Sequence, residues 1–182
     1  VVYDMMLTSA AVMKVWEDDN NRDGLRPAGL TVELLADGQP TGRTVTLNAA
    51  NHWTAVLKDL PAVKDSKKIV YTWQEPKVGG YTLTSDKADG ATLTTLTNTH
   101  VPAKTEISVK KVWEDSNDAA RKRPSGIEVQ LYADGRALGE AVTLDAANGW
   151  VYTWKDLYLN ICEDGTSRAI RYTVAETEIP DG

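Results

Sequence analysis

The chain lacks several features on which broad classes of protein depend. It has one cysteine, Cys162, in 182 residues, so no disulfide bond can form within the chain. No apolar run approaches the roughly 20 residues that a membrane-spanning helix needs. The first residues lack the basic flank of a signal peptide. We therefore expect no membrane span, and we expect any export signal or wall anchor to lie outside this chain.

The chain also lacks a strong excess of either sign of charge. Acidic and basic residues are mixed along the chain, and the formal net charge is only −6. A nucleic-acid groove needs clustered lysine and arginine, so nucleic acid is not an expected partner. The two histidines, His52 and His100, have no metal-ligand spacing, and no phosphate loop or nucleophile elbow is present. We expect no metal, no cofactor and no enzyme that turns over.

What the chain has in abundance is internal repetition. The run Lys-Val-Trp-Glu-Asp occurs twice at an offset of 97 residues, and the same offset relates Trp53 to Trp150. Each copy has the size of a single domain, and the period is too long for a solenoid. The repeat therefore predicts two tandem modules joined by a segment that Pro102 stiffens. The expected parts are a leader, or the tail of a preceding module, over residues 1–11, module 1 over 12–100, a linker over 101–106 and module 2 over 107–182.

Both copies read as β-structure. Short segments rich in Val, Thr, Tyr and Trp alternate with period two, and turn sequences such as the repeated Ala-Asp-Gly bound them. No stretch has helical apolar spacing. About seven such strands in a module predict an all-β, immunoglobulin-like sandwich.

Three polar residues of module 1 fall in the apolar phase of their strands. Period-two alternation places Lys14, Glu75 and Asn98 on the inner faces of three different predicted strands, and Lys111 and Glu176 repeat the first two in module 2. Unpaired buried charges are too costly to persist. One interpretation is a buried lysine–glutamate ion pair capped by an amide, or strand ends that reach solvent.

The alternative interpretation is a chemical reaction. Burial lowers the pKa of a lysine and raises that of a carboxyl group. A neutral amine is a nucleophile, and a protonated carboxyl polarises an amide carbonyl and moves protons. Held together in a dry core, an amine and a carboxamide would form an amide cross-link once per molecule, with loss of ammonia.

The pattern KVWED…RP…LYADG…VTL.AAN.W…YTV.E…TNT resembles the Cna-B type (collagen-adhesin B-repeat) domains of Gram-positive surface adhesins and pilins. The resemblance covers nearly the whole chain from Val12 onward. It implies inverse immunoglobulin-like sandwiches in which Lys14 bonds to Asn98, the asparagine of Thr-Asn-Thr, with Glu75 as the catalytic acid. Formation of this isopeptide bond would be a single-turnover reaction.

Module 2 departs from the pattern. Lys111 and Glu176 match, but the sequence stops at Gly182, before any counterpart of residues 93–99. We therefore expect module 2 to lack its last strand and the asparagine partner of Lys111. An open strand edge invites a donor strand. The strand-like residues 1–6 of another molecule are one candidate donor, with Asp4 as a carboxyl partner.

The resemblance also implies a function. The modules would be structural stalk or spacer repeats of an extracellular, cell-wall-attached adhesin or pilin of a Gram-positive bacterium. Their partners would be neighbouring modules, with a host extracellular matrix ligand bound through other domains. The alternative is a module that itself binds a host protein or glycan, for which the non-repeated segments 63–68 and 161–167 are the candidate places.

Two further patterns have simpler explanations. Asp19, Asn21 and Asp23 resemble the start of an EF-hand loop, but Leu30 stands where that loop needs a bidentate glutamate. We expect a polar connection between strands there. Most of the six tryptophans recur in core phase, which favours core packing over a sugar-binding platform. Cys162 lies in the region where the second copy is longer than the first, and the sequence assigns it no function.

Overall fold

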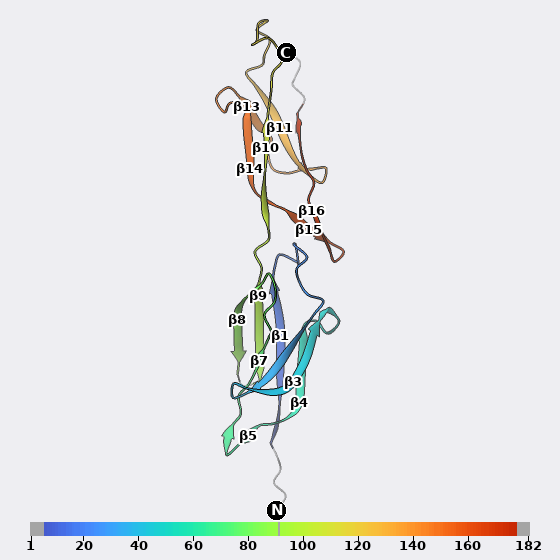
Figure 1. Cartoon of the computed structure of the whole chain (residues 1–182), viewed down its shortest axis with the longest axis vertical. Helices are drawn as coiled ribbons and strands as arrows, with labels where there is room; N and C mark the ends of the chain where they lie inside the picture. The colour runs from blue at the N-terminus through green and yellow to red at the C-terminus, as the bar shows by residue number, and fades with distance from the viewer. Residues whose placement is uncertain (1–5, 91, 178–182) are drawn as a thin grey trace, which may run out of the picture. The chain divides into compact units, whose positions relative to one another are not determined.

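The computed structural model describes residues 6–90 and 92–177. The chain divides into two compact units, Val1–Val101 and Pro102–Gly182, here called module 1 and module 2. Regular structure in both is almost entirely β-strand (Figure 1). The first strand begins at Leu7, earlier than expected, because Leu7 pairs with Pro61. The first strand of module 2 begins at Lys104, inside the expected linker.

Module 1 consists of two facing sheets. One has the strand order β4-β1-β9-β8 and the other the order β3-β2-β7. A 3-10 turn, η1, and a small hairpin, β5–β6, connect them. The elements are β1 (Leu7–Glu17), β2 (Gly29–Ala36), β3 (Gln39–Asn48), η1 (Ala49–Asn51), β4 (Thr54–Pro61), β5 (Val63–Lys64), β6 (Lys67–Lys68), β7 (Tyr71–Gln74), β8 (Thr82–Asp89) and β9 (Leu93–Thr99).

The repeated Ala-Asp-Gly sequence forms the same tight turn in both modules. Asp37 and Gly38, between β2 and β3, have φ values of 48° and 78°. Asp134 and Gly135 have φ values of 49° and 78°. Two successive positive φ values define the hairpin turn whose twist matches that of the flanking strands, and Asp-Gly is among the sequences that adopt it most readily.

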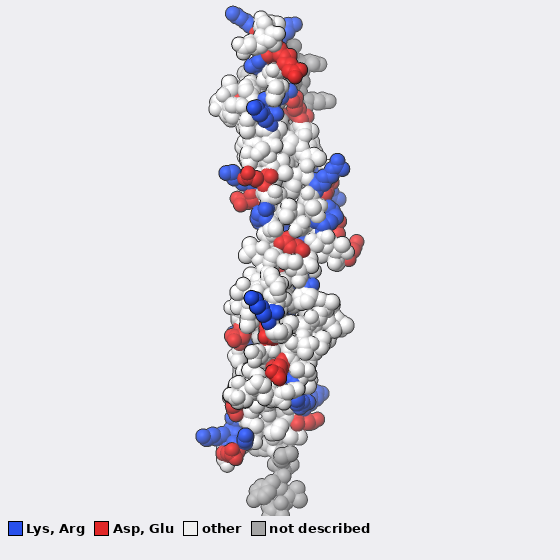
Figure 2. Space-filling model, in the orientation of Figure 1, with Lys and Arg blue, Asp and Glu red and all other residues white. Residues whose placement is uncertain are grey.

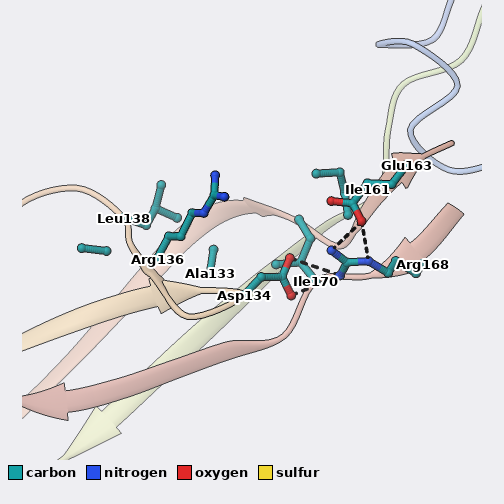
Figure 3. A pocket seen from close by; sticks show the side chains of 9 residues that line it. Ala133, Asp134, Arg136, Leu138, Ile161, Glu163, Arg168 and Ile170 are labelled. Carbon is teal, nitrogen blue, oxygen red and sulfur yellow. Dashed lines mark hydrogen bonds and ion pairs between the residues drawn. The ribbon is translucent and has the colours of Figure 1, made fainter.

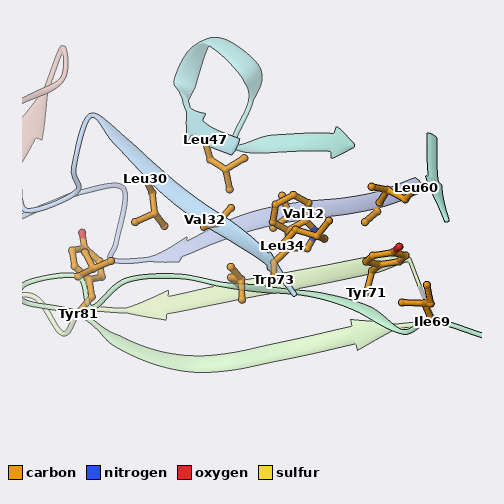
Figure 4. Close-up of a cluster of buried hydrophobic side chains, with 13 residues drawn as sticks. Val12, Leu30, Val32, Leu34, Leu47, Leu60, Ile69, Tyr71, Trp73 and Tyr81 are labelled. Atoms are coloured by element: carbon orange, nitrogen blue, oxygen red, sulfur yellow. The ribbon is translucent and has the colours of Figure 1, made fainter. Parts of the chain in front are cut away.

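The core of module 1 lies between its two sheets, as the alternation predicts (Figure 4). Val12 of β1 and Leu96 of β9 are each 1% exposed and come from one sheet, and Leu34 of β2, fully buried, comes from the other. Tyr71 and Trp73 of β7 point into the same cluster. The apolar burial that stabilises the sandwich therefore depends on strands from both sheets.

The first and last strands of module 1 are parallel neighbours. Lys14 of β1 pairs with Leu96 of β9, and Trp16 pairs with Asn98. Because β1 and β9 run in the same direction, the chain enters module 1 at one end of this strand pair and leaves at the other. A force on the two chain ends would therefore shear β1 along β9.

Module 2 repeats the strand arrangement of module 1 up to β17, which pairs with β11 as β7 pairs with β2. The pair β10-β14 corresponds to β1-β4, and the second sheet has the order β12-β11-β13 with β17 also paired to β11. Within the described residues β10 has no partner on the edge that β9 occupies in module 1. The elements are β10 (Lys104–Lys110), β11 (Gly126–Ala133), β12 (Arg136–Ala137), β13 (Val142–Asp145), β14 (Val151–Tyr158), β15 (Asn160–Glu163), β16 (Thr166–Ala169) and β17 (Tyr172–Glu176).

Candidate cross-linking site

The three polar residues predicted to face the core of module 1 are buried, and two of them meet. Nζ of Lys14 lies 3.0 Å from Oε2 of Glu75, and the exposed fractions of the two side chains are 0% and 5%. Nζ also donates to the carbonyl oxygen of Leu96 at 3.4 Å. Lys14 comes from the first sheet, and Glu75 directly follows β7 of the second. The contact therefore joins the two sheets across the core.

Burial changes the protonation equilibrium of the amine. Desolvation lowers the pKa of Lys14, and the adjacent Glu75 carboxylate opposes this shift by hydrogen bonding and by its charge. The net effect is a lowered pKa for Lys14, so deprotonating this amine costs less free energy in the protein than in water. A neutral primary amine has a free electron pair and is a nucleophile.

Asn98 supplies a carboxamide on the neighbouring strand. It is 1% exposed, and its Oδ1 has no hydrogen-bond partner among the described residues. Lys14 stands opposite Leu96, so Asn98 is the next inward-facing residue along β9. Diagonal neighbours on one face of a sheet are close enough for long side chains to meet. Amine, carboxyl and carboxamide thus share one buried region of the core.

The corresponding pair in module 2 lies in a different environment. Lys111 Nζ and Glu176 Oε1 form an ion pair, but the exposed fractions of these side chains are 23% and 44%. The difference follows from the strand arrangement, because no strand in the described part of the chain covers β10 on the side where β9 covers β1. The two lysines therefore share a sequence position but not a degree of desolvation.

Comparison with known proteins assigns the fold and the repeat. Residues 10–99 and 107–181 each match the Cna protein B-type domain family. The chain belongs to this family. It is 38% identical over 174 residues to a collagen adhesin of Staphylococcus aureus, a match that covers 96% of this chain and 14% of the adhesin. The two matched segments account for both copies of the sequence repeat.

A solved structure supports the same assignment. The crystal structure of two B repeat units of the collagen-binding protein Cna of Staphylococcus aureus has a TM-score of 0.85 and 36% identity, covering 95% of this chain and 45% of that chain. The crystal structure of a single B repeat unit of the same protein is 37% identical over 96% of this chain and 87% of that chain, with a TM-score of 0.46. The all-β tandem architecture expected from the sequence is confirmed.

Each B-type module also contains an arginine–aspartate pair that the sequence reasoning missed. In module 1, Asp18 accepts from Arg26 Nη2 at 2.6 Å and from the Tyr81 hydroxyl at 2.7 Å. Asp115 and Arg123 repeat the pair in module 2. The repeat could have predicted this pair, because the aspartate after Trp-Glu and the arginine before Pro occur in both copies. These pairs fix the connection that follows the first strand of each module.

His100 forms a second missed contact at the end of β9. Its Nε2 lies 2.7 Å from Asp23 Oδ2, and its Nδ1 lies 2.8 Å from the carbonyl oxygen of Gly80. A carbonyl oxygen and a carboxylate both accept hydrogen bonds, so this arrangement favours the protonated imidazole, in which both ring nitrogens donate. Consistently, the hydrogen bond to Asp23 raises the pKa of His100.

The loop that resembles the start of an EF-hand uses its acids within the protein. Asp19 pairs with Arg22, and Asp23 faces His100. Among the residues that the structure describes, no group of three or more His, Cys, Asp or Glu side chains is arranged to hold a metal ion. The loop is a polar connection between β1 and β2.

The tryptophans serve mainly as packing residues, as predicted. Trp73 is 4% exposed in the core of module 1, and Trp16 packs edge-on against Trp53 with ring centroids 5.3 Å apart. Trp113 and Trp150 repeat the latter contact in module 2 at 5.2 Å.

The hairpin β15–β16 of module 2, whose sequence does not repeat that of module 1, borders a cavity of about 460 Å³ (Figure 3). Arg168 bridges Asp134 and Glu163 across it. Ile161 and Ile170 contribute apolar surface. Cys162 lies on β15 as a free thiol, half-buried.

The surface of each module carries mixed charge. On the face shown in Figure 2, lysine and arginine side chains lie among aspartate and glutamate side chains in both modules. No helix in the described ranges is long and apolar enough to cross a membrane.

Proposed function

We propose that this chain is a pair of spacer modules in the stalk of an extracellular, cell-wall-attached adhesin or pilin of a Gram-positive bacterium. Module 1 is rigidified by an intramolecular isopeptide bond between Lys14 and Asn98. The family supports the role, since a collagen adhesin is its relative over 96% of this chain. The chain spans only 14% of that adhesin, so the partners of a whole protein enter as proposals: neighbouring modules, and a host matrix ligand bound by other domains.

The bond forms in a single event in which Glu75 moves protons. One proton passes from the Lys14 ammonium to Glu75, and the neutral amine attacks Cγ of Asn98. The Nζ–Cγ bond forms and the Cγ–Nδ2 bond breaks. The second amine proton leaves with the departing nitrogen as ammonia, and Glu75 is left protonated. Once protonated, Glu75 could donate a hydrogen bond to the Asn98 carbonyl oxygen and so stabilise the negative charge that develops there.

The observation that carries this proposal is the burial of the Lys14 and Glu75 side chains, 0% and 5% exposed, in a module whose buried Asn98 oxygen has no partner among the described residues. A buried ion pair alone is often no more stabilising than apolar residues of the same volume. An unpaired buried carbonyl adds a further cost. A reaction that consumes the amine and the carboxamide accounts for all three groups.

An intact-mass measurement of the purified protein beside a Lys14→Ala variant tests the proposal. We expect the wild-type mass to fall short of the calculated mass by one ammonia, and the variant to have its full mass. A full mass for the wild-type chain would remove the cross-link and leave Lys14 and Glu75 as an ordinary buried ion pair.

The same measurement reports on module 2. We propose the same roles for Lys111 and Glu176, with a partner strand that is not among the described residues. Loss of a second ammonia would show that Lys111 has found an amide in this chain. Loss of a water would indicate a carboxyl partner such as Asp4, which lies outside the described residues together with most of the proposed donor segment 1–6.

A second candidate function is binding of a host protein or glycan by the modules themselves. The hairpin β15–β16 favours it, because this hairpin is longer than its counterpart β5–β6 and borders the cavity of Figure 3. Replacing Arg168 with Ala would release the bridge across this cavity. Binding to immobilised matrix proteins that weakens in this variant, but not in Lys14→Ala, would support the second function over the spacer.

A further inference from the structure

A second cavity, of about 460 Å³, opens at one side of module 1 beside the proposed cross-linking site. Its walls come from the edge strands of the two sheets, β7 and β8, and from the neighbouring strands β2 and β9. Glu75 and Thr94 both line it, together with the exposed Asp86 of β8. The volume admits several water molecules. The cavity therefore connects the buried carboxyl with the solvent side of the sandwich.

Thr94 is an anomaly on the wall of this cavity. The residue is 2% exposed, faces inward from β9 beside Val12 of β1, and its Oγ1 has no hydrogen-bond partner among the described residues. Buried hydroxyls are normally satisfied, and an unsatisfied one calls for an explanation. Valine has the same shape and would fill this core position without the cost of the hydroxyl.

Two residues of the proposed cross-linking site also have buried polar atoms without a hydrogen-bond partner of the usual geometry in the described residues. Glu75 Oε2 forms an ion pair with Lys14 Nζ at 3.0 Å but has no further hydrogen-bond partner in the described residues, and Asn98 Oδ1 has none. Glu75, which must move protons, therefore needs another group to hold its carboxyl in line. Thr94 offers both a donor and an acceptor on the cavity that Glu75 lines.

We propose that Thr94 is a positioning residue of the cross-linking reaction, whose hydroxyl orients the Glu75 carboxyl through solvent admitted to the shared cavity. This inference rests on the proposed isopeptide bond and adds a residue to its machinery. Thr94 touches neither the amine nor the carboxamide, and its effect passes through Glu75.

The test separates the hydroxyl of Thr94 from its methyl group. Chains prepared unfolded in urea, before any bond has formed, are diluted into buffer, and loss of ammonia is timed by intact mass. We expect Thr94→Val to slow the reaction about tenfold, because a misplaced proton-transfer group loses rate steeply. Thr94→Ser should react within about twofold of the wild-type rate. Thr95→Val, one residue along β9 on the opposite face, is the matched control and should react at the wild-type rate.

Stability distinguishes positioning from packing. The variants are compared in a background that cannot react, Lys14→Met with Glu75→Met. There Thr94→Val should unfold at the same denaturant concentration as the background or a higher one, and Thr94→Ser at a lower one. The slow variant would thus be the stable one, an order that a purely structural role cannot produce.

The outcomes separate this inference from the proposed bond. If the wild-type chain loses no ammonia, the bond and the role of Thr94 both fall. If the wild-type chain loses ammonia and Thr94→Val loses it at the same rate, only the role of Thr94 is overturned. If Thr94→Ser is as slow as Thr94→Val, the methyl group and not the hydroxyl matters, and the positioning role is again wrong.

Discussion

At the scale of single residues, module 1 keeps a lysine and a glutamate where apolar side chains would suffice. Both are almost completely withdrawn from water. The same two positions in module 2 remain partly exposed. Identical residue types therefore differ in burial, because one strand, β9, covers β1 and β10 has no such neighbour among the described residues.

The role of Glu75 predicts a specific loss in a conservative variant. Glu75→Gln keeps the shape of the side chain but cannot take the proton from Lys14. We expect formation of the bond to slow by at least about a hundredfold, the lower range for removing a general acid–base group. Intact mass after refolding measures it. Glu176→Gln, the equivalent change in module 2, should leave the ammonia loss of module 1 unchanged, and an equal effect of both variants would contradict the assignment.

His100 predicts a dependence of stability on pH. The hydrogen bond to Asp23 raises its pKa, desolvation opposes the rise, and the Gly80 carbonyl adds to it. Tyr81 packs against the ring, and the charge of Asp18 also favours protonation. A group whose pKa is higher in the folded state stabilises fully below its unfolded pKa of about 6.5. That stabilisation is lost as pH rises through the folded pKa.

We therefore expect His100→Gln to destabilise module 1 at about pH 5 and to have a much smaller effect at about pH 9. Urea unfolding in the Lys14→Met, Glu75→Met background gives the midpoints at both pH values. Titration of the His100 ring by NMR in Asp23→Asn is the companion measurement, and its pKa should fall there. A midpoint difference that does not change with pH would refute the protonated contact.

At the scale of strands and loops, the same Asp–Arg pair occurs in both modules but is more deeply buried in module 1. Asp18 is 2% exposed, and burial alone would raise its pKa. Hydrogen bonds from Arg26, Tyr81 and the amide of Asn21 outweigh burial and leave the pKa below its usual value. In module 2 the Asp115 side chain is 28% exposed. Removing one partner of a buried ion pair leaves the other charge unpaired in the protein interior, whereas solvent screens the charge that remains from an exposed pair.

Arg26→Met should therefore cost about 3 kcal/mol of unfolding free energy in module 1. Arg123→Met should cost module 2 clearly less. Urea unfolding followed by tryptophan fluorescence measures both, again in the background without the cross-link. Equal losses in the two modules would show that burial of Asp18 does not set the strength of the pair.

Alternation along the strands made most of the fold and the inner faces predictable from the sequence. The burial of Lys14 and Asn98 agrees with the period-two phase of their strands, and the repeated Val-x-Lys-Val-Trp pattern around Lys14 supported the phase of the first strand. Thr94 and His100 were not predictable. Their significance depends on which strands and turns lie beside them, and β9 meets β1 only through the parallel pairing of residues about 80 positions apart. The start of β1 at Leu7 was missed because the continuous sequence identity between the two copies begins only near Lys14, although both first strands start earlier, at Leu7 and Lys104, and pair with the ends of β4 and β14.

At the scale of the whole molecule, the parallel arrangement of β1 and β9 decides what the cross-link achieves. A pull on the chain ends of module 1 shears these two strands, and the proposed bond joins them directly. Residues between Lys14 and Asn98 would then be shielded from the force. Module 2, without such a bond in the described residues, supplies an internal reference in the same molecule.

Single-molecule stretching of the chain between terminal handles measures this shielding. In the wild-type chain we expect one large unfolding step, from module 2, and no extension of the segment 14–98. In Lys14→Met, Glu75→Met a second step should appear, with a gain in contour length on the order of 300 Å, since each of the released residues spans at most about 3.6 Å. The step from module 2 should have the same length in both proteins. Two steps in the wild-type chain would mean that module 1 carries load without a covalent link, and the stiffness of the spacer would then rest on its β-sheet hydrogen bonds and core packing.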